Sequence, residues 1–405
     1  MEADDSIKQT SKATACLLAA RVLRDFGDGF VAVLLPVYLL ALKFSPLEVG
    51  VIATVALLGS ALLTIGVGFL GVRYDHRQLL IAAASLMIAT GVAFAVVHDY
   101  AVLIIIAFIG TVNPSSGSVS VFVPLEHAVL TREVSANART NMFAHYSLAG
   151  ALGGAIGALA AAIPDVLAPV GFDQLTGIKM MFVLYAVLGL FGGLLYACIP
   201  QRRAIQGSRT SAALGPSRYI VYKLAALFSL DAFAGGFVVQ SLLALWLFER
   251  FDLSLTTAGI FFFWAGVLSA FSFPVAVWLS RRFGLINTMV FTHIPSSVAL
   301  ILASISPTLP LALFFLLIRA ALSQMDVPTR SSYVMAVVTD AERAAAASFT
   351  AVPRSLAAAA SPALAGVLFA ASFRAWPLII CGALKIIYDL LLLMQFRHVK
   401  PPEEK

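Results

Sequence analysis

Charged side chains lie inside long apolar stretches of this sequence, where an unpaired charge would be costly and a functional role is the first hypothesis. The densest group lies near the N-terminus and comprises Arg21, Arg24, Asp25 and Asp28. If this stretch is a helix, the spacing places all of them on one face. Arg21 can then pair with Asp25 one turn away. Arg24 can reach Asp28 in the same way, so we expect either a cavity face with a protonatable carboxylate or a self-neutralised ladder that only shapes the helix.

The corresponding stretch in the second half of the chain contains one acid, Asp231. An internal alignment, given below, places Asp231 at the position of Arg24. We expect these two side chains to attract each other across a central cavity in one conformation and to separate in another. When unpaired, Asp231 could take up a proton. The expected coupling residues are therefore Asp25, Asp28 and Asp231.

A third group of charges lies in the tenth apolar stretch, where Arg319, Asp326 and Arg330 share a helical face. Arg319 falls near the middle of the membrane, so we expect a substrate or coupling role, with a structural ion pair as the alternative. Asp326 and Arg330 are spaced to pair with each other at a gate or in a structural contact. Pro328 and its counterpart Pro124 should kink their helices, which makes these helices candidate gates.

Other polar residues complete the candidate site. The residues expected in the substrate cavity, besides Arg24 and Arg319, are Asn113, Tyr146, Gln240 and Gln324. The residues expected in a gate or structural ion network, besides Asp326 and Arg330, are Arg73, Arg77, Glu126, Arg139, Arg282 and Arg354. Glu126 is expected near the membrane interface with Arg132 or Arg139. Lys385 and Asp389 are spaced for an i,i+4 pair, which we interpret as structural.

Long apolar stretches must position these side chains. Of 405 residues, 60% are hydrophobic and only 12% are charged, about half the charged fraction of a soluble domain. Continuous apolar runs without alternation exclude a β-barrel. Runs of roughly 20 residues predict an all-α membrane protein with twelve transmembrane helices. They lie at 14–42, 46–72, 78–97, 101–129, 141–163, 177–199, 218–248, 254–280, 285–305, 308–337, 344–371 and 375–396.

Lysine and arginine predict the orientation of these helices. With both termini in the cytoplasm, 17 basic residues fall in cytoplasmic segments and 4 on the other side, as the positive-inside rule requires. The first apolar run is too long for a signal peptide and is expected to be retained. We therefore expect a multi-pass protein of the inner membrane.

The two halves of the chain resemble each other in sequence. A shift of about 207 residues places Phe26–Val31 on Phe233–Val238, and Val123-Pro124 later matches Val327-Pro328. This repeat predicts two pseudo-symmetric six-helix bundles, residues 1–199 and 218–405, joined by a cytoplasmic linker at 200–217. Such bundles can rock about a shared interface and expose a central site to one side at a time.

These features resemble the major facilitator superfamily over nearly the whole chain. The superfamily's loop motif, roughly G-x-L-x-D-R-x-G-R-R, is matched at Gly68, Leu70, Arg73 and Arg77, whereas Val72 stands at its acidic position and Asp75 at its second glycine. A second copy retains Arg282 and Gly284. The stretch with Gly150, Gly153 and Gly154 resembles the G-P-x-x-G-G motif of proton-coupled exporters in the superfamily, with Gly150 in place of the proline, although we favour close helix packing as the role of these glycines.

The resemblance implies a secondary transporter rather than an enzyme, and no metalloprotease, hydrolase or phosphate-loop motif contradicts this. We expect proton-coupled export of a small molecule, by antiport, with uptake or exchange of an anionic metabolite held by arginines as the alternative. A non-transporting receptor is the third possibility. The expected partners are the substrate, protons or another coupling ion, and the lipid bilayer. We expect a monomer without cofactor, metal site, disulfide or nucleic-acid partner.

Overall fold

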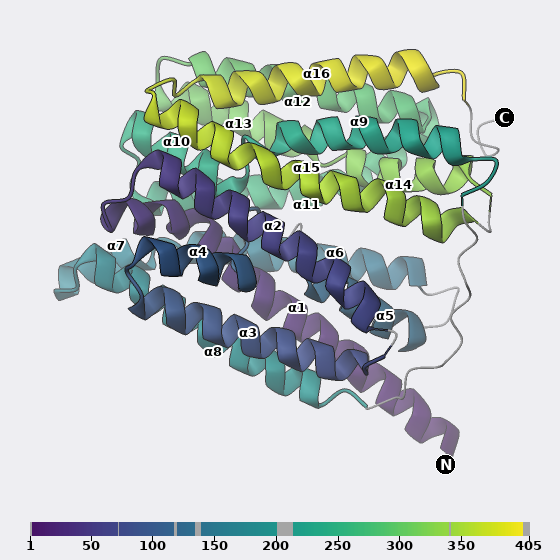
Figure 1. Ribbon diagram of the computed structural model, residues 1–405, viewed down its shortest axis with the longest axis horizontal. Helices are drawn as coiled ribbons and strands as arrows, with labels where there is room; N and C mark the ends of the chain where they lie inside the picture. Colours follow the sequence, from purple (N-terminus) through teal and green to yellow (C-terminus); the bar gives the residue numbers. More distant parts are fainter. Residues whose placement is uncertain are drawn as a thin grey trace. The chain divides into compact units, whose positions relative to one another are not determined.

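The computed structural model describes residues 2–71, 73–116, 120–133, 139–200, 214–339 and 342–399, with the backbone alone for 2–11, 69, 132–133, 139–141 and 344. Every regular element in these ranges is helical (Figure 1). The α-helices are α1 Glu2–Ala41, α2 Pro46–Leu70, α3 His76–Val96, α4 Tyr100–Ile109, α5 Phe122–Glu133, α6 Arg139–Ala160, α7 Ile163–Leu167, α8 Gln174–Ala197, α9 Arg218–Gly236, α10 Gln240–Phe251, α11 Leu255–Phe283, α12 Leu285–Ile305, α13 Leu309–Ser323, α14 Asp326–Val337, α15 Arg343–Ala370 and α16 Trp376–Phe396.

Each of the twelve expected segments coincides with one helix or with two successive helices. Within the described ranges, 10 helical segments are long and apolar enough to cross a membrane. The other two expected segments are α1, which carries the cluster of arginines and aspartates, and the stretch that is broken into α4 and α5. The all-α membrane fold is confirmed.

Two compact units divide the chain. Unit 1 comprises Met1–Ser45, Val55–Gly207 and Asp252–Phe263, and unit 2 comprises Pro46–Thr54, Ser208–Phe251 and Trp264–Lys405. In unit 1, α1 packs against α6 and α8, and α3 packs against α8. In unit 2, α9 packs against α15, and α12 packs against α13 and α16. The boundaries expected at 199 and 218 stay a prediction, and most of the linker, 201–213, lies outside the described residues.

The expected proline kinks take a different form in the structure. Pro124 and Pro328 each occupy the third residue of a helix, because α5 begins at Phe122 and α14 begins at Asp326. Proline is tolerated there, since the first turn of a helix has no internal acceptor for its N–H groups. The chain breaks before each proline instead of bending at it, and the two breaks occur at matching places in the sequence repeat.

Glycines bring α1 and α6 into close contact within unit 1. A Cβ atom added at Gly157 would lie 2.0 Å from the carbonyl oxygen of Phe26, and one added at Gly29 would lie 2.1 Å from that of Gly154. Side chains of any size would push the two helices apart.

In the exporter-like motif, a Cβ at Gly150 would lie 2.4 Å from Asp25 Oδ2. A Cβ at Gly153 would lie 3.0 Å from the carbonyl oxygen of Val22. Close packing against α1 therefore explains these two glycines, whereas a Cβ at Gly154 would meet nothing closer than 3.5 Å.

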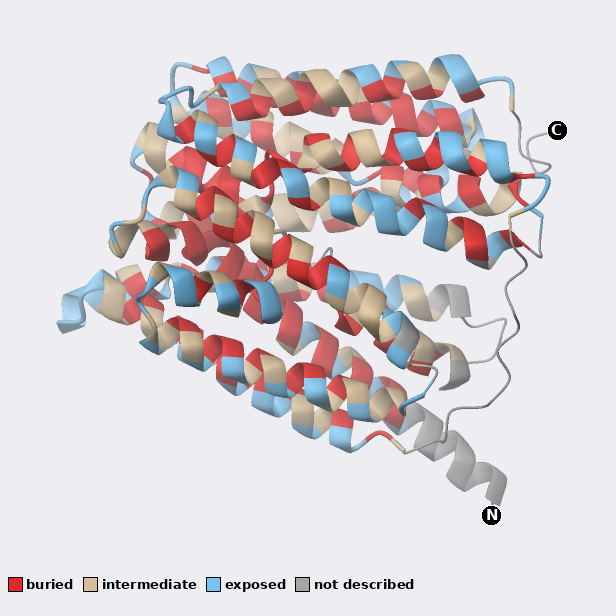
Figure 2. Cartoon of the chain, in the orientation of Figure 1, coloured by how far each residue is buried: buried red, intermediate tan, exposed pale blue. Residues whose placement is uncertain are grey.

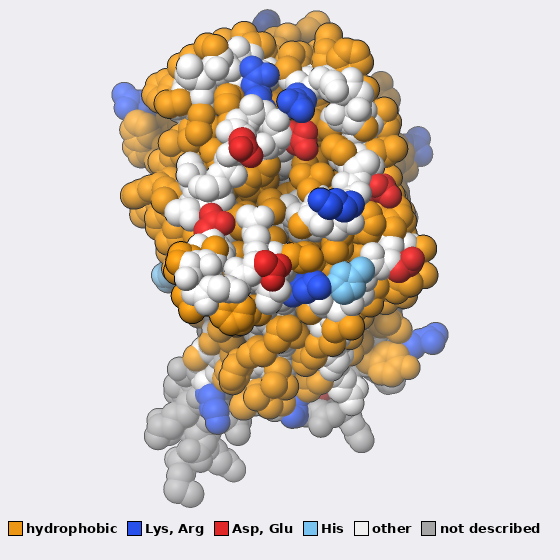
Figure 3. Space-filling model, turned by 90° about the vertical axis from the view of Figure 1, so that its left-hand side faces the viewer, with side chains coloured by type: hydrophobic (Ala, Val, Ile, Leu, Met, Phe, Trp, Pro, Cys, Tyr) orange, Lys and Arg blue, Asp and Glu red, His pale blue; other side chains and the backbone are white. Residues whose placement is uncertain are grey.

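Apolar side chains are exposed along the spanning helices, as expected for surfaces that face lipid. Phe271 and Met394 are 62% and 74% exposed. Figure 2 shows buried and exposed residues alternating along individual helices. On the face drawn in Figure 3, hydrophobic atoms cover much of the surface, and acidic and basic side chains are scattered among them. The charges described next are instead buried.

Candidate functional site

Helix α1 positions a buried ion cluster in unit 1. Arg21, Arg24, Asp25 and Asp28 are all at most 9% exposed. The Arg21 Nε atom lies 2.7 Å from the Asp25 carboxylate, which confirms the expected pair one turn apart. Arg24 also contacts Asp25, at 3.5 Å. The guanidinium of Arg21 stacks on the Tyr146 ring, 4.8 Å from its centre.

Glu126 on α5 is the principal partner of Arg24. The Arg24 Nη1 atom donates to Glu126 at 3.0 Å, and the Tyr196 hydroxyl donates to the same carboxylate at 2.5 Å. The Tyr146 hydroxyl donates to it as well. Glu126 is fully buried and pairs with Arg24 of α1. The side chains of its expected partners, Arg132 and Arg139, lie outside the described residues, so a contact with them stays a prediction.

Asp28 stands apart from these ion pairs. The Tyr185 hydroxyl lies 3.3 Å from the Asp28 carboxylate and 3.0 Å from the carbonyl oxygen of Thr111, and its single hydrogen can be donated to either acceptor. Among the residues that the structure describes, no basic side chain lies within 4.0 Å of Asp28. The expected pair of Arg24 with Asp28 was therefore wrong, because Arg24 pairs with Glu126 on α5.

Asp231 on α9 is the centre of a second ion cluster, in unit 2. Lys385 Nζ of α16 donates to it at 2.6 Å, and Arg330 Nη1 of α14 donates at 3.1 Å. Arg330 also pairs with Asp326 at 3.1 Å, as the spacing of these two residues predicted. In this conformation Asp231 and Arg24 are each paired within their own unit. Their expected exchange of partners stays a prediction.

His293 of α12 joins this second cluster and was missed in the sequence. Its Nδ1 atom lies 3.0 Å from the Asp389 carboxylate, and its Nε2 atom lies 3.3 Å from Lys385 Nζ. Lys385 and Asp389 therefore do not form the local pair that their spacing suggested, and that interpretation was wrong. The available signal was Lys385 in a largely apolar helix, because a buried lysine requires a nearby acid, which can come from a distant part of the sequence.

Two membrane arginines have no ion pair in the structure. Among the described residues, no carboxylate lies within 4.0 Å of Arg319 on α13 or Arg354 on α15. Arg319 is half-buried, and Arg354 is exposed. Arg354 is still in electrostatic range of Asp231, whereas Arg319 has no ion pair in the described part of the chain, and an arginine without an ion pair can bind an anion.

The remaining candidate residues are dispersed. The Asn113 side chain accepts hydrogen bonds from the N–H and hydroxyl of Ser115, and so holds the turn before α5. Gln240 begins α10, and Gln324 is exposed in the break between α13 and α14. Arg77 donates to the carbonyl of Ala197 at 2.6 Å. Arg73 and Arg282 are exposed, and the side chain of Arg139 lies outside the described residues.

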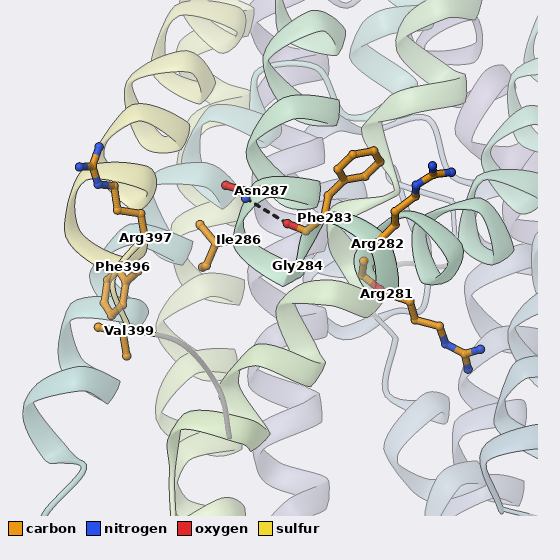
Figure 4. Close-up of a pocket in the computed structure, with 10 residues that line it drawn as sticks. Arg281, Arg282, Phe283, Gly284, Ile286, Asn287, Phe396, Arg397 and Val399 are labelled. Atoms are coloured by element: carbon orange, nitrogen blue, oxygen red, sulfur yellow. Dashed lines mark hydrogen bonds between the residues drawn. The ribbon is translucent and has the colours of Figure 1, made fainter. Parts of the chain in front are cut away.

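A cavity of about 330 Å³ lies elsewhere in unit 2, where α11 meets α12 near the end of α16. Figure 4 shows Arg281, Arg282 and Arg397 at its rim, with their guanidinium groups directed away from one another. None of the residues of the two buried ion clusters lines this cavity. We therefore keep it separate from the candidate site.

Comparisons with known proteins agree with this architecture. An uncharacterized membrane protein of Saccharomyces cerevisiae, YJR124C, is 22% identical over 97% of this chain and 96% of its own length. A bacterial homologue of the human lysosomal transporter Spinster has a TM-score of 0.72 at 15% identity, over 95% of this chain and 94% of its own. The nucleoside transporter NupG has a TM-score of 0.71 at 14% identity, over 96% and 99%. The family model described as Major Facilitator Superfamily matches residues 17–218 and 224–405, and the chain belongs to this superfamily of secondary transporters.

Proposed function

We propose that this transporter couples the export of a small molecule to the movement of protons, and that Asp28 is its proton-binding residue in unit 1. The isolation of Asp28 is the observation that carries the proposal. Its side chain is buried, and its hydrogen-bond partner is a neutral tyrosine hydroxyl. An ionised carboxylate in such a site lacks the counter-charge that would offset its desolvation. Binding a proton removes that charge, and releasing it restores the charge.

The surrounding contacts support a group that changes its charge on its own. Asp25, one turn earlier, is already neutralised by Arg21 and Arg24. Tyr185 can donate its hydroxyl hydrogen to ionised Asp28, or accept one from the protonated form. Asp28 can therefore gain or lose a proton without breaking a neighbouring ion pair. Alternating access between two bundles would expose it to each side of the membrane in turn.

Export as the direction of transport is supported by a sequence resemblance. The exporter-like glycine stretch favours export by resemblance, but contact between α1 and α6 explains two of these glycines. We also propose that both termini lie in the cytoplasm of a cell with this protein in its inner membrane, because the positive residues are distributed in that way.

Uptake or exchange of an anionic metabolite is the second candidate function. It is favoured by Arg319, which has no carboxylate within 4.0 Å in the described part of the chain. Arginine binds carboxylate and phosphate groups through paired hydrogen bonds. Arg24 is a weaker candidate for binding such an anion, because its guanidinium already pairs with the Glu126 carboxylate.

Flux measurements in reconstituted vesicles test both functions. Vesicles with a pH-sensitive dye in the lumen receive cationic amines, nucleosides, carboxylates or phosphate esters in turn. We expect one class to change the lumen pH with wild-type protein. Asp28→Asn should abolish this coupled proton movement and retain exchange of labelled for unlabelled substrate. A matched control is Asp252→Asn, since Asp252 is exposed on a left-handed turn (φ 49°) that asparagine also adopts.

The outcomes separate the candidates. Coupled flux that survives Asp28→Asn would show that another residue binds the proton. Transport restricted to carboxylates or phosphate esters, and lost in Arg319→Gln, would favour the anionic metabolite. Ligand binding without flux in any of the vesicles would indicate a receptor.

A further inference from the structure

His293 is enclosed by charged groups from several helices of unit 2. The imidazole is 2% exposed. Lys385 and Asp389 face it from α16, and Asp231 of α9 lies 3.9 Å from its Nε2 atom. The ring of Tyr388 packs against it edge-on, with centroids 6.0 Å apart. These contacts leave the imidazole in touch with both signs of charge.

Further charges lie behind this first layer. Arg330 of α14 holds the second oxygen of Asp231 and pairs with Asp326. Arg354 of α15 is in electrostatic range of Asp231, but it is exposed and not part of the buried cluster. Arg319 of α13 contributes its carbonyl oxygen to the hydroxyl of Ser296 on α12.

The hydrogen bonds assign a tautomer to the neutral ring. Nδ1 faces the Asp389 carboxylate at 3.0 Å, and a carboxylate can only accept, so Nδ1 carries the hydrogen. Nε2 is then the free acceptor and faces Lys385 Nζ at 3.3 Å. Lys385 donates to Asp231 at 2.6 Å as well. The lysine thus bridges a carboxylate and a neutral imidazole.

The charges of the buried cluster do not balance when His293 is neutral. Its carboxylates are Asp231, Asp326 and Asp389, and its permanent cations are Lys385 and Arg330. The cluster then carries one excess negative charge. A proton on the imidazole removes this excess, and histidine is the side chain whose charge changes most readily near neutral pH.

We propose that His293 is a proton-binding site in unit 2 and that protonation exchanges the partner of Asp231. A proton from the aqueous phase binds Nε2. The imidazolium can no longer accept from Lys385 and repels its ammonium group. The new Nε2–H turns to Asp231, 3.9 Å away in the neutral form, and Lys385 is released. Loss of the proton from Nε2 reverses each step. A role of His293 in transport rests on the proposed proton coupling. The change of the partner of Asp231 is an equilibrium property and can be measured without transport.

Nitrogen NMR of the purified full-length chain in nanodiscs tests this exchange. The chain has 6 histidines, and His293→Gln identifies the signals of His293. We expect the Nδ1–H tautomer in the neutral form and conversion to the imidazolium as the pH is lowered. The Nζ signal of Lys385 should shift over the same pH range. His98→Gln is the matched control, because His98 is exposed and its loss should leave the other signals unchanged.

Two variants keep the test decisive if His293→Gln folds poorly. Asp389→Asn should shift the neutral ring toward the Nε2–H tautomer. Lys385→Met should leave the Nδ1–H tautomer in place and remove the Nζ signal, which assigns that signal to Lys385. An Nε2–H tautomer in wild-type protein, or a Lys385 signal that ignores the titration of His293, overturns the proposal. If His293 titrates as described but no pH-driven flux is found, the proposed function fails and the proton site stands. Coupled flux with a silent His293 overturns the site alone.

Discussion

The buried ion clusters of units 1 and 2 contain the same number of permanently charged groups, but different side chains form hydrogen bonds with their carboxylates. Each has two permanent cations and three carboxylates: Arg21 and Arg24 with Asp25, Asp28 and Glu126, and Lys385 and Arg330 with Asp231, Asp326 and Asp389. In unit 1, the hydroxyl groups of three tyrosines donate to Glu126 and Asp28. In unit 2, an imidazole forms a hydrogen bond with Asp389.

This difference has a consequence for how each cluster responds to pH. A tyrosine hydroxyl donates a hydrogen bond without adding a charge, and it stays protonated well above neutral pH. A histidine changes its charge near neutral pH. The cluster of unit 1 is therefore expected to be rigid except at Asp28, whereas that of unit 2 can rearrange its partners.

The largest expected effect comes from removing the central acceptor of each cluster. Glu126→Ala removes the nearest carboxylate from Arg24, which keeps its 3.5 Å contact with Asp25 and its place over the Phe122 ring. The substitution also removes the acceptor of two tyrosine hydroxyls. We expect a loss of about 3 to 5 kcal/mol in the free energy of unfolding. Asp231→Ala should cost less, because Arg330 keeps Asp326 at 3.1 Å. Reversible unfolding in detergent mixtures measures both.

A charge-free double variant provides the control. Arg24→Met combined with Glu126→Met removes both partners, and most of the lost stability should return, since no buried charge is left unpaired. Equal losses in Glu126→Ala and Asp231→Ala would contradict the idea that the tyrosine-lined cluster depends more on a single acceptor.

Glycine substitutions should produce the next largest effect. A Cβ at Gly157 would lie 2.0 Å from the backbone oxygen of Phe26, and a backbone atom cannot swing away. Gly157→Ala should therefore cost about 1 to 3 kcal/mol by overpacking. In unit 2, a Cβ at Gly236 meets the Ser361 hydroxyl at 2.1 Å and the carbonyl of Ala358 at 2.4 Å. We expect a similar loss for Gly236→Ala, because helix contact is needed in both units.

Gly192 is the matched control for these two variants. Nothing lies within 4 Å of a Cβ built there, and alanine favours a helix over glycine by roughly 0.5 to 1 kcal/mol. Thermal unfolding of the three alanine variants decides the matter. A stable Gly157→Ala protein would mean that α1 and α6 can separate without loss, and the expected dependence of unit 1 on this close helix contact would be wrong.

Hydropathy was sufficient to predict the helices, since apolar runs of membrane length are visible without any tertiary information. The repeat also predicted a structural correspondence, because Pro124 and Pro328 both occupy the third residue of a helix. The breaks before these prolines were not predicted. The sequence signals that proline disrupts a helix, but not whether the helix bends or restarts nearby.

Partners of the buried charges were only partly predictable. Arg21 and Asp25 pair locally as expected, but Arg24 pairs with Glu126, 102 residues away, and Lys385 with Asp231, 154 residues away. Spacing shows which charges share a helix face and not which other helix meets that face. A local and a distant partner are therefore equally compatible with the sequence. His293 escaped notice for this reason, because nothing near it in sequence marks its contact with Asp389.

Glu342 lies outside the membrane-spanning segments and belongs to neither cluster, so it provides a carboxylate for comparison at lower pH. Glu342 accepts hydrogen bonds from the Thr339 hydroxyl at 2.6 Å, the Ser217 hydroxyl at 2.8 Å and the N–H of Gly215 at 2.5 Å. The hydroxyls of Thr339 and then Ser217 are the main cause that lowers the pKa of Glu342 to about 2. These bonds fix the segment before α9 to the loop before α15.

The smallest expected effect is the pH dependence of this contact. Because the pKa is lower in the folded protein than its ordinary value of 4.5, the stabilisation is complete above that value and is lost as the pH falls toward about 2. Glu342→Gln should lower the unfolding temperature by a constant amount at neutral and mildly acidic pH, and the difference from wild type should shrink in stronger acid. A Glu342→Gln difference that already shrinks between neutral and mildly acidic pH would contradict the lowered pKa of Glu342 and the hydrogen bonds that cause it.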